Sequence, residues 1–214
     1  MERKFRKKVS GLNNLKKLIY LISPNKIYKS FYNDLEKVLI SKKIQFFQLR
    51  LKKTPKDKTI QVAKKIREIT KKYKVKFIIN DNANLAKIVK ADGCHLGQLD
   101  GSVNDAKKYL KSKIVGVTCH NSKLFAKTAI KDKADYIAFG SFYKSHLKPS
   151  AKKANLRILR WAKKNIKKPI VAIGGINNLN YKKLINSGAK YIAISSYIWD
   201  NPKLKPELAI KKFK

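Results

Sequence analysis

Hydrophobic residues along the chain form short runs that alternate with longer segments, in which apolar positions recur at helical spacing. The short runs are rich in Ile, Val, Phe and Tyr and lack the strict alternation of a half-exposed sheet. Such runs are typical of strands buried on both faces of a parallel sheet. They predict strands at 18–22, 44–49, 76–80, 93–96, 114–118, 135–140, 169–173 and 190–195.

The segments between these runs have the periodicity of amphipathic helices. In 26–42, for example, Ile27, Phe31, Leu35 and Val38 fall on one helical face. Asn104, Asn121 and Asn178 stand near predicted helix starts, where a side-chain oxygen can cap free N–H groups. The pattern predicts helices at 26–42, 56–73, 83–90, 103–111, 122–131, 151–165, 180–187 and 203–212.

The strands and helices alternate eight times without a break in composition. Strict alternation favours a parallel sheet with right-handed crossovers, and eight units favour a closed (β/α)8 TIM barrel in one domain. A doubly wound open sheet is the alternative, but it usually carries a glycine-rich turn after its first strand, where this chain has Ser23-Pro24-Asn25-Lys26. We therefore predict a barrel over 17–214, preceded by a basic extension over 1–16.

Composition sets limits on where the protein works. Hydrophobic residues make up 43% of the 214 residues, enough for a packed core. The apolar run at 18–22 is far shorter than the roughly 20 residues needed to span a bilayer, and the basic start lacks the apolar stretch of a signal peptide. Cys94 and Cys119 have no zinc-site spacing and are expected to be buried in strands. We expect a cytoplasmic protein with no metal–cysteine site.

The net charge of +39 raises the alternative of nucleic-acid binding. Most of that charge comes from lysines spread along every predicted helix, as in coding sequence rich in A and T, and only six residues are arginines. Specific nucleic-acid recognition favours arginine, whose planar group makes paired hydrogen bonds. We expect weak, salt-sensitive, nonspecific binding and no specific nucleic-acid partner.

Polar residues at the carboxyl ends of the predicted strands are the candidates for chemistry, since this end carries the active site in TIM barrels. At the end of the second strand, Gln48, Arg50 and Lys52 share one face, and Arg with Lys suits a diphosphate. Asn80 and Asp81 end the third strand, and Asp100 follows the fourth. In a chain with only 13 acidic residues, two carboxylates on adjacent strand ends beside a phosphate site predict Mg2+.

The later strand ends supply a second set of candidates. Gly174-Gly175 follows the seventh strand and Ser195-Ser196 the eighth, which is where barrels often bind a phosphate group. Thr118 ends the fifth strand. His120 and His146 have no local carboxylate partner, so we expect them to line the site and not to shuttle protons, and His95 is expected to be structural.

Several motifs resemble those of the thiamine-phosphate synthase family, in its order and spacing over about residues 18–200. They are QLRLK at 48–52, NDNANLA at 80–86, ADGCHLGQLD at 91–100, VGVTCH at 115–120, ADYIAFGSFYKSHLK at 134–148 and VAIGGI at 171–176. The resemblance implies a (β/α)8 barrel that couples 4-amino-2-methyl-5-hydroxymethylpyrimidine diphosphate with a thiazole phosphate. The products are thiamine phosphate and pyrophosphate, Mg2+ is the cofactor, and both substrates are small molecules.

By motif position, the resemblance also assigns roles. It implies that the pyrimidine diphosphate contacts Gln48, Arg50, Lys52 and Asn80, with Thr118 replacing a serine nearby. Asp81 and Asp100 correspond to Mg2+ ligands, and Ser145 and Lys148 match the loop after the sixth strand. Gly175 and Ser196 match the thiazole-phosphate site, to which Ser195 adds a hydroxyl. Catalysis would then rest on Arg50, Lys52 and Lys148, which neutralise the departing diphosphate.

Three positions depart from the family pattern. Leu147 stands where a threonine is usual, and it cannot donate a hydrogen bond to a thiazole phosphate. Ser23-Pro24 replaces a common Thr-Asp pair, and Leu99 replaces an acidic residue. A thiazole tautomerase, which would rely on a histidine such as His120, and a noncatalytic basic nucleic-acid-binding barrel remain the alternatives. The sequence leaves open whether the chain forms a homo-oligomer.

Overall fold

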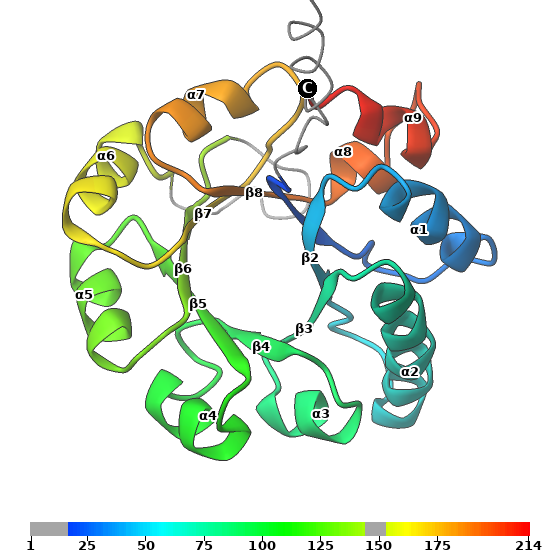
Figure 1. Cartoon of the computed structure of the whole chain (residues 1–214), viewed down its shortest axis with the longest axis horizontal. Helices are drawn as coiled ribbons and strands as arrows, with labels where there is room; N and C mark the ends of the chain where they lie inside the picture. Colours follow the sequence, from blue (N-terminus) through cyan, green and yellow to red (C-terminus); the bar gives the residue numbers. More distant parts are fainter. Residues whose placement is uncertain (1–16, 144–152) are drawn as a thin grey trace, which may run out of the picture.

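The computed structural model describes residues 17–143 and 153–214, which form a closed barrel of eight parallel strands in chain order. Each strand pairs with the next, and β8 pairs with β1 to close the ring (Figure 1). The predicted TIM barrel is confirmed, and the open doubly wound sheet is excluded. The strands are β1 Ile19–Ile22, β2 Ile44–Leu49, β3 Lys76–Asn80, β4 Gly93–Leu96, β5 Ile114–His120, β6 Tyr136–Gly140, β7 Ile170–Ile173 and β8 Tyr191–Ile194.

Helices surround the barrel as an outer ring, and at least one helix follows each strand in the chain (Figure 1). In the described ranges, no helix has the length and apolar character required to cross a membrane. The helices are α1 Phe31–Leu39, α2 Lys56–Lys72, α3 Ala83–Ile88, α4 Val103–Leu110, α5 Lys123–Lys131, α6 Leu156–Asn165, α7 Tyr181–Asn186, α8 Ser196–Trp199 and α9 Pro206–Lys211.

Two hydrophobic layers explain why the strands are apolar almost throughout. Alternate residues point outward and pack beneath the helices, as Leu21, Phe47 and Ile79 do. The residues between them point into the barrel, where Tyr20 and Phe46 meet at a ring-centroid distance of 5.2 Å. Both faces of each strand are thus removed from water, so a buried barrel strand needs hydrophobic residues on both faces.

The first helix is shorter than its apolar pattern indicates. It begins at Phe31, not at residue 26, and ends at Leu39 before Lys42, whose φ is +56°. Ile27 lies one helical repeat before Phe31 and packs against the same core from a nonhelical segment, which is why the pattern was misleading. Ser30 precedes the helix, and its hydroxyl donates to Asp34 Oδ2 at 2.9 Å.

The predicted caps are wrong at two helices by one or two residues. Ser122, not Asn121, accepts the N–H of Phe125 at α5, and Ser102, not Asn104, caps α4. A serine hydroxyl next to the first helical residue reaches the free N–H groups of the first turn. Before α7, Asn178 makes no cap, because Asn177 and Asn180 accept each other's backbone N–H groups in a turn.

Other elements also differ from the prediction. α6 begins at Leu156 and not at residue 151, because Asn155 caps it by accepting the N–H of Arg157 at 2.9 Å. β5 continues two residues beyond Thr118 through an irregular pairing with β6. The short helix α8 was not predicted, since four residues carry no helical period; the indole N–H of its Trp199 donates to Ile22 O at 2.6 Å.

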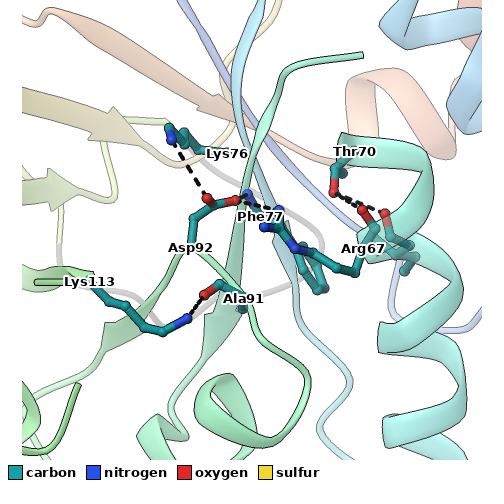
Figure 2. A network of polar contacts seen from close by, with 8 residues as sticks. Arg67, Thr70, Lys76, Phe77, Ala91, Asp92 and Lys113 are labelled. Atoms are coloured by element: carbon teal, nitrogen blue, oxygen red, sulfur yellow. Dashed lines mark hydrogen bonds and ion pairs between the residues drawn. The ribbon is translucent and has the colours of Figure 1, made fainter. Parts of the chain in front are cut away.

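Two aspartates brace the end of the barrel where strands begin. Asp92, just before β4, accepts the backbone N–H of Phe77 and the guanidinium of Arg67, both at 2.8 Å, and pairs with Lys76 at 3.6 Å (Figure 2). Asp135 occupies the same place before β6, where it accepts the N–H of Val115 and the ammonium of Lys107. Each carboxylate therefore joins its own strand to the odd-numbered strand before it.

These two sites belong to a repeat of the chain. Ala91-Asp92 and Ala134-Asp135 precede β4 and β6, and Ala189-Lys190 stands in the same position before β8. In each case the alanine N–H donates to the helix before it, and the residue preceding the alanine has a positive φ. Lys190 cannot accept an N–H, so the repeat provides the carboxylate brace only at the first two of these positions.

We expect Asp92→Ala to lower the free energy of unfolding by about 2 kcal/mol, because it leaves the N–H of Phe77 and the charge of Arg67 without their acceptor. Glu68→Ala is the matched control, since it removes one carboxylate from an exposed position on α2. Urea unfolding followed by circular dichroism measures both. Equal losses for the two variants would contradict the role of Asp92 as a brace.

Candidate active site

At the carboxyl end of β2, the neighbouring strands hold the amide of Gln48 and the backbone of Arg50. Gln48 is 3% exposed, and its Nε2 donates to Asn80 Oδ1 of β3 at 2.7 Å. The backbone N–H of Arg50 donates to the hydroxyl of Ser23, which follows β1, at 3.0 Å. The structure thus brings Gln48, Arg50 and Asn80 together at the mouth, on the ends of neighbouring strands.

The two candidate metal ligands lie side by side after β3 and β4. Asp81 adopts a left-handed backbone with φ of +61°, and its N–H donates to the carbonyl of His95 at 2.7 Å. Burial raises the pKa of Asp81, and the hydrogen bond and negative charge of Asp100 raise it further. The positive charges of Lys52, whose Nζ lies 3.6 Å from Asp81 Oδ2, and of Arg50 oppose that increase.

This pair fits a divalent cation. Asp100 is itself held in place, since its Oδ2 accepts the N–H of Gly97 at 2.8 Å. Asp81 is partly buried and Asp100 is exposed, and the two carboxylates provide hard oxygen ligands at a site where the negative charge of Asp100 raises the pKa of Asp81. Within 17–143 and 153–214, no group of three or more His, Cys, Asp or Glu side chains comes together. That suits Mg2+, which usually takes one or two carboxylates and completes its shell with water and phosphate oxygens.

Behind these groups, a chain of hydrogen bonds crosses the barrel interior. Tyr20 and Tyr136 share a hydrogen bond between their hydroxyls at 2.7 Å, and the hydroxyl of Tyr136 lies 2.9 Å from Nδ1 of His95. The other ring nitrogen of His95, Nε2, lies 2.8 Å from Oγ1 of Thr118. Burial lowers the pKa of His95 to about 4, so the imidazole is neutral at physiological pH. The chain connects the centre of the barrel with Thr118 near its mouth.

The candidate phosphate groups follow β7 and β8. Gly174 has a φ of +107°, and a Cβ there would lie 2.0 Å from the hydroxyl of Ser141, so the close approach of these two loops requires glycine. Gly175 follows with a φ of +59°. The hydroxyl of Ser195 already donates to Ser23 O at 3.0 Å, whereas Ser196 begins α8. Ser195 is therefore tied to the end of β1.

Some predicted residues lie elsewhere. His120 is the last residue of β5; it is exposed at the rim, its ring is edge-on to that of Phe125, and it is not enclosed by the site. Ser145, His146, Leu147 and Lys148 fall outside the described residues. Cys94 and Cys119 are free and buried in strands, as predicted.

Sequence reasoning missed the contacts of two residues that shape this site, Ser23 and His95. Ser23 is 2% exposed and accepts the N–H of Arg50, although it entered the sequence comparison only as a departure from a pattern. His95 was assigned to the structural core without its link to Thr118. The signal was present in both cases, since each is a polar residue within or directly after an otherwise apolar strand.

Comparison with known proteins places this geometry in a family. The family model described as thiamine monophosphate synthase matches residues 19–198. Thiamine-phosphate synthase of Pelagibacter ubique (strain HTCC1062) is 56% identical over 200 residues, which cover 93% of this chain and 97% of that protein. The chain belongs to the thiamine-phosphate synthase family. The enzymes of this family are transferases, and this membership favours the synthase over a tautomerase or a nucleic-acid-binding barrel.

More distant members of the thiamine-phosphate synthase family agree. The enzyme of Rhodospirillum centenum (strain ATCC 51521 / SW) is 34% identical over 197 residues, or 91% of this chain and 95% of that protein. The solved structure of thiamine phosphate pyrophosphorylase from Pyrococcus furiosus superimposes with a TM-score of 0.82 at 28% identity. That superposition covers 94% of this chain and 96% of the other. The similarity therefore extends over the whole barrel.

We expect Asp81→Asn to raise the melting temperature of the metal-free protein at neutral pH. Because folding raises the pKa of Asp81, the ionised carboxylate is less favourable in the folded state than in the unfolded chain. This cost is absent below the ordinary aspartate pKa, grows as the pH rises through the raised pKa, and is complete above it.

The measurement is thermal unfolding in a chelator at neutral and at acidic pH. The stabilisation should be present at neutral pH and disappear under acid, and Asp57→Asn, an exposed change in the first turn of α2, should show no gain. A lower midpoint for Asp81→Asn at neutral pH would mean that Lys52 and Arg50 stabilise the carboxylate more than burial and Asp100 destabilise it.

Proposed function

We propose that this chain couples 4-amino-2-methyl-5-hydroxymethylpyrimidine diphosphate with a thiazole phosphate, releasing thiamine phosphate and pyrophosphate. The observation that carries the proposal is the composite mouth of the barrel. There the basic and amide groups at the carboxyl ends of β2 and β3 lie beside the carboxylate pair of Asp81 and Asp100. A diphosphate and a divalent cation are the ligands that such a mixture of charges suits.

The reaction asks the protein chiefly to stabilise a departing diphosphate. The C–O bond to the diphosphate breaks first, which leaves a cation stabilised by the pyrimidine ring and places negative charge on the leaving group. Arg50 offers a planar set of donors, and Lys52 adds a point charge close to Asp81. Cationic groups placed in advance where charge develops lower the barrier without reorganising during the reaction.

Asp81 and Asp100 would hold Mg2+ in this scheme. When bound, Mg2+ would neutralise charge on the diphosphate oxygens and so favour departure of the leaving group. The remaining steps depend on the chain itself. Gln48 orients Asn80 through the hydrogen bond between their side chains, and Ser23 fixes the backbone from which Arg50 extends.

The bond-forming step requires no base from the protein. The thiazole nitrogen attacks the pyrimidine cation through its own lone pair, so no proton has to be removed from that nitrogen. His95, neutral and buried, lies in the interior chain behind the site. Preorganised charge and orientation are therefore the two contributions that we assign to the residues at the mouth.

We expect the full chain, mixed with both substrates and Mg2+, to form thiamine phosphate and pyrophosphate in equal amounts, as measured by chromatography and a coupled phosphate assay. Chelation of Mg2+ should abolish the reaction, and Asp81→Asn should lose the Mg2+-dependent turnover. Isomerisation of the thiazole without coupling would instead identify a tautomerase and overturn the proposal.

We expect Arg50→Ala to lower kcat/KM for the pyrimidine diphosphate by at least about tenfold, because a charge-assisted hydrogen bond to a phosphate is lost. Arg160→Ala is the matched control, since it removes the same charge from an exposed position on α6. Steady-state kinetics with varied pyrimidine diphosphate compares the two. Equal kinetics for both variants would remove Arg50 from the site.

A further inference from the structure

The hydrogen-bond chain in the barrel interior has a closed end and an open end. The closed end is Tyr20, which is fully buried; Phe46 and Tyr136 lie around its ring, with centroids at 5.2 and 5.7 Å. Among the described residues, the hydroxyl of Tyr20 has only the hydroxyl of Tyr136 as a hydrogen-bond partner. The open end is Thr118, which is only partly buried and lies near the mouth.

The closed end fixes the direction of every hydrogen bond in the chain. A buried donor without an acceptor costs more than an unused lone pair, so the proton of Tyr20 must go to the oxygen of Tyr136. Tyr136 then donates its own proton to Nδ1 of His95, since no other acceptor is recorded for it in the described chain. In the reverse direction, the proton of Tyr20 would have no acceptor.

The direction of the chain decides the tautomer of His95. Nδ1 accepts the hydrogen bond from Tyr136 and therefore carries no hydrogen of its own, so the proton of the ring resides on Nε2. That N–H points at Oγ1 of Thr118 at 2.8 Å and uses one of the lone pairs of the hydroxyl. The hydroxyl proton of Thr118 cannot be donated back to His95 and is left for an acceptor at the mouth.

The packing of the barrel is built around this chain. The ring of Tyr136 passes over Gly116 of β5, where a Cβ would lie 1.9 Å from Cζ. Any other residue at Gly116 would therefore displace the hydroxyl of Tyr136 from both of its partners. The ring of His95 stacks on that of Tyr136, with an interplanar angle of 18° and centroids 5.6 Å apart. The imidazole thus has little freedom to turn away from Thr118.

We propose that His95 is a positioning residue that commits the hydroxyl of Thr118 to donate its hydrogen to a phosphate oxygen of the diphosphate substrate. A phosphate oxygen only accepts hydrogen bonds, so a hydroxyl held as a pure donor is preorganised for it. This inference rests on the proposed function for the identity of the ligand. The hydrogen-bond direction itself follows from the interior of the barrel alone.

The tautomer is tested first, without substrate. In protein labelled with 15N at histidine, NMR at neutral pH should show Nε2 of His95 protonated and Nδ1 unprotonated. The His120→Gln and His146→Gln variants identify the signals of the other two histidines. Protonation of Nδ1 would overturn the proposal. This result does not depend on turnover, so it is separate from any failure to form thiamine phosphate.

The role of Thr118 is tested next, with inorganic pyrophosphate and Mg2+ as the probe. Thr118→Val, which removes the donor, should weaken pyrophosphate binding about tenfold by calorimetry, whereas Thr118→Ser should bind nearly as wild type does. If Thr118→Val binds pyrophosphate as tightly as wild type, or if wild type does not bind it at all, the hydroxyl does not serve a phosphate and the proposal fails.

A pair of tyrosine variants separates positioning from stability. Tyr136→Phe removes the donor to Nδ1, so a fraction of His95 should shift its proton to Nδ1, and pyrophosphate binding should weaken severalfold. Tyr181→Phe is the matched control, because it also deletes a buried phenol hydroxyl, one that donates to Lys214 O outside the barrel interior. It should change neither the tautomer nor the binding. Equal effects of the two variants would reduce His95 to a structural role and overturn the proposal.

Discussion

The pairing of β1 with β8 closes the sheet, and the contacts that join the end of β1 to the segment after β8 depend on that closure. Tyr20 of β1 lies in register with Ala193 of β8, although most of the chain separates them. The same seam carries the hydrogen bonds from Ser195 to Ser23 O and from Trp199 to Ile22 O. Because Ser23 also accepts the N–H of Arg50, the seam extends to the basic end of β2. A sheet open between β8 and β1 would leave the hydroxyl of Ser195 and the indole N–H of Trp199 without these partners.

Closure also creates an interior that no single strand can fill. Tyr20, Phe46, Tyr136 and Tyr191 meet there from four strands and exclude water from the middle of the barrel. The hydroxyls of Tyr20 and Tyr136 are buried away from solvent, so they bond to each other, and Tyr136 also bonds to His95. The polar chain is therefore a consequence of filling the barrel with tyrosine. Its exit at Thr118 is what connects the packing of the core to the chemistry of the mouth.

The fold could be predicted well from the sequence because the same requirement, a strand buried on both faces, recurs in every βα unit. Eight buried strands require eight apolar runs, and Gln48 stands out as polar within one of them. Helix starts were less predictable: Ile27 and Phe31 contact one core from different local conformations, and neighbouring serines compete with asparagines for caps. The link from His95 to Thr118 was beyond sequence reasoning for a different reason. It depends on Gly116, which leaves room for the ring of Tyr136, and only the folded barrel shows that this ring lies over that glycine.

The chain has 13 acidic and 52 basic residues, and its carboxylates have different roles at the two ends of the barrel. At the end where strands begin, Asp92 and Asp135 each accept a backbone N–H and a cationic side chain. At the other end, Asp81 and Asp100 lie next to each other, and the pKa of Asp81 is raised. Carboxylates that served stability alone would not be paired in this way amid so many lysines. A bound cation would relieve the repulsion between these two carboxylates. We therefore place the chemistry at the mouth and not at the end braced by Asp92 and Asp135.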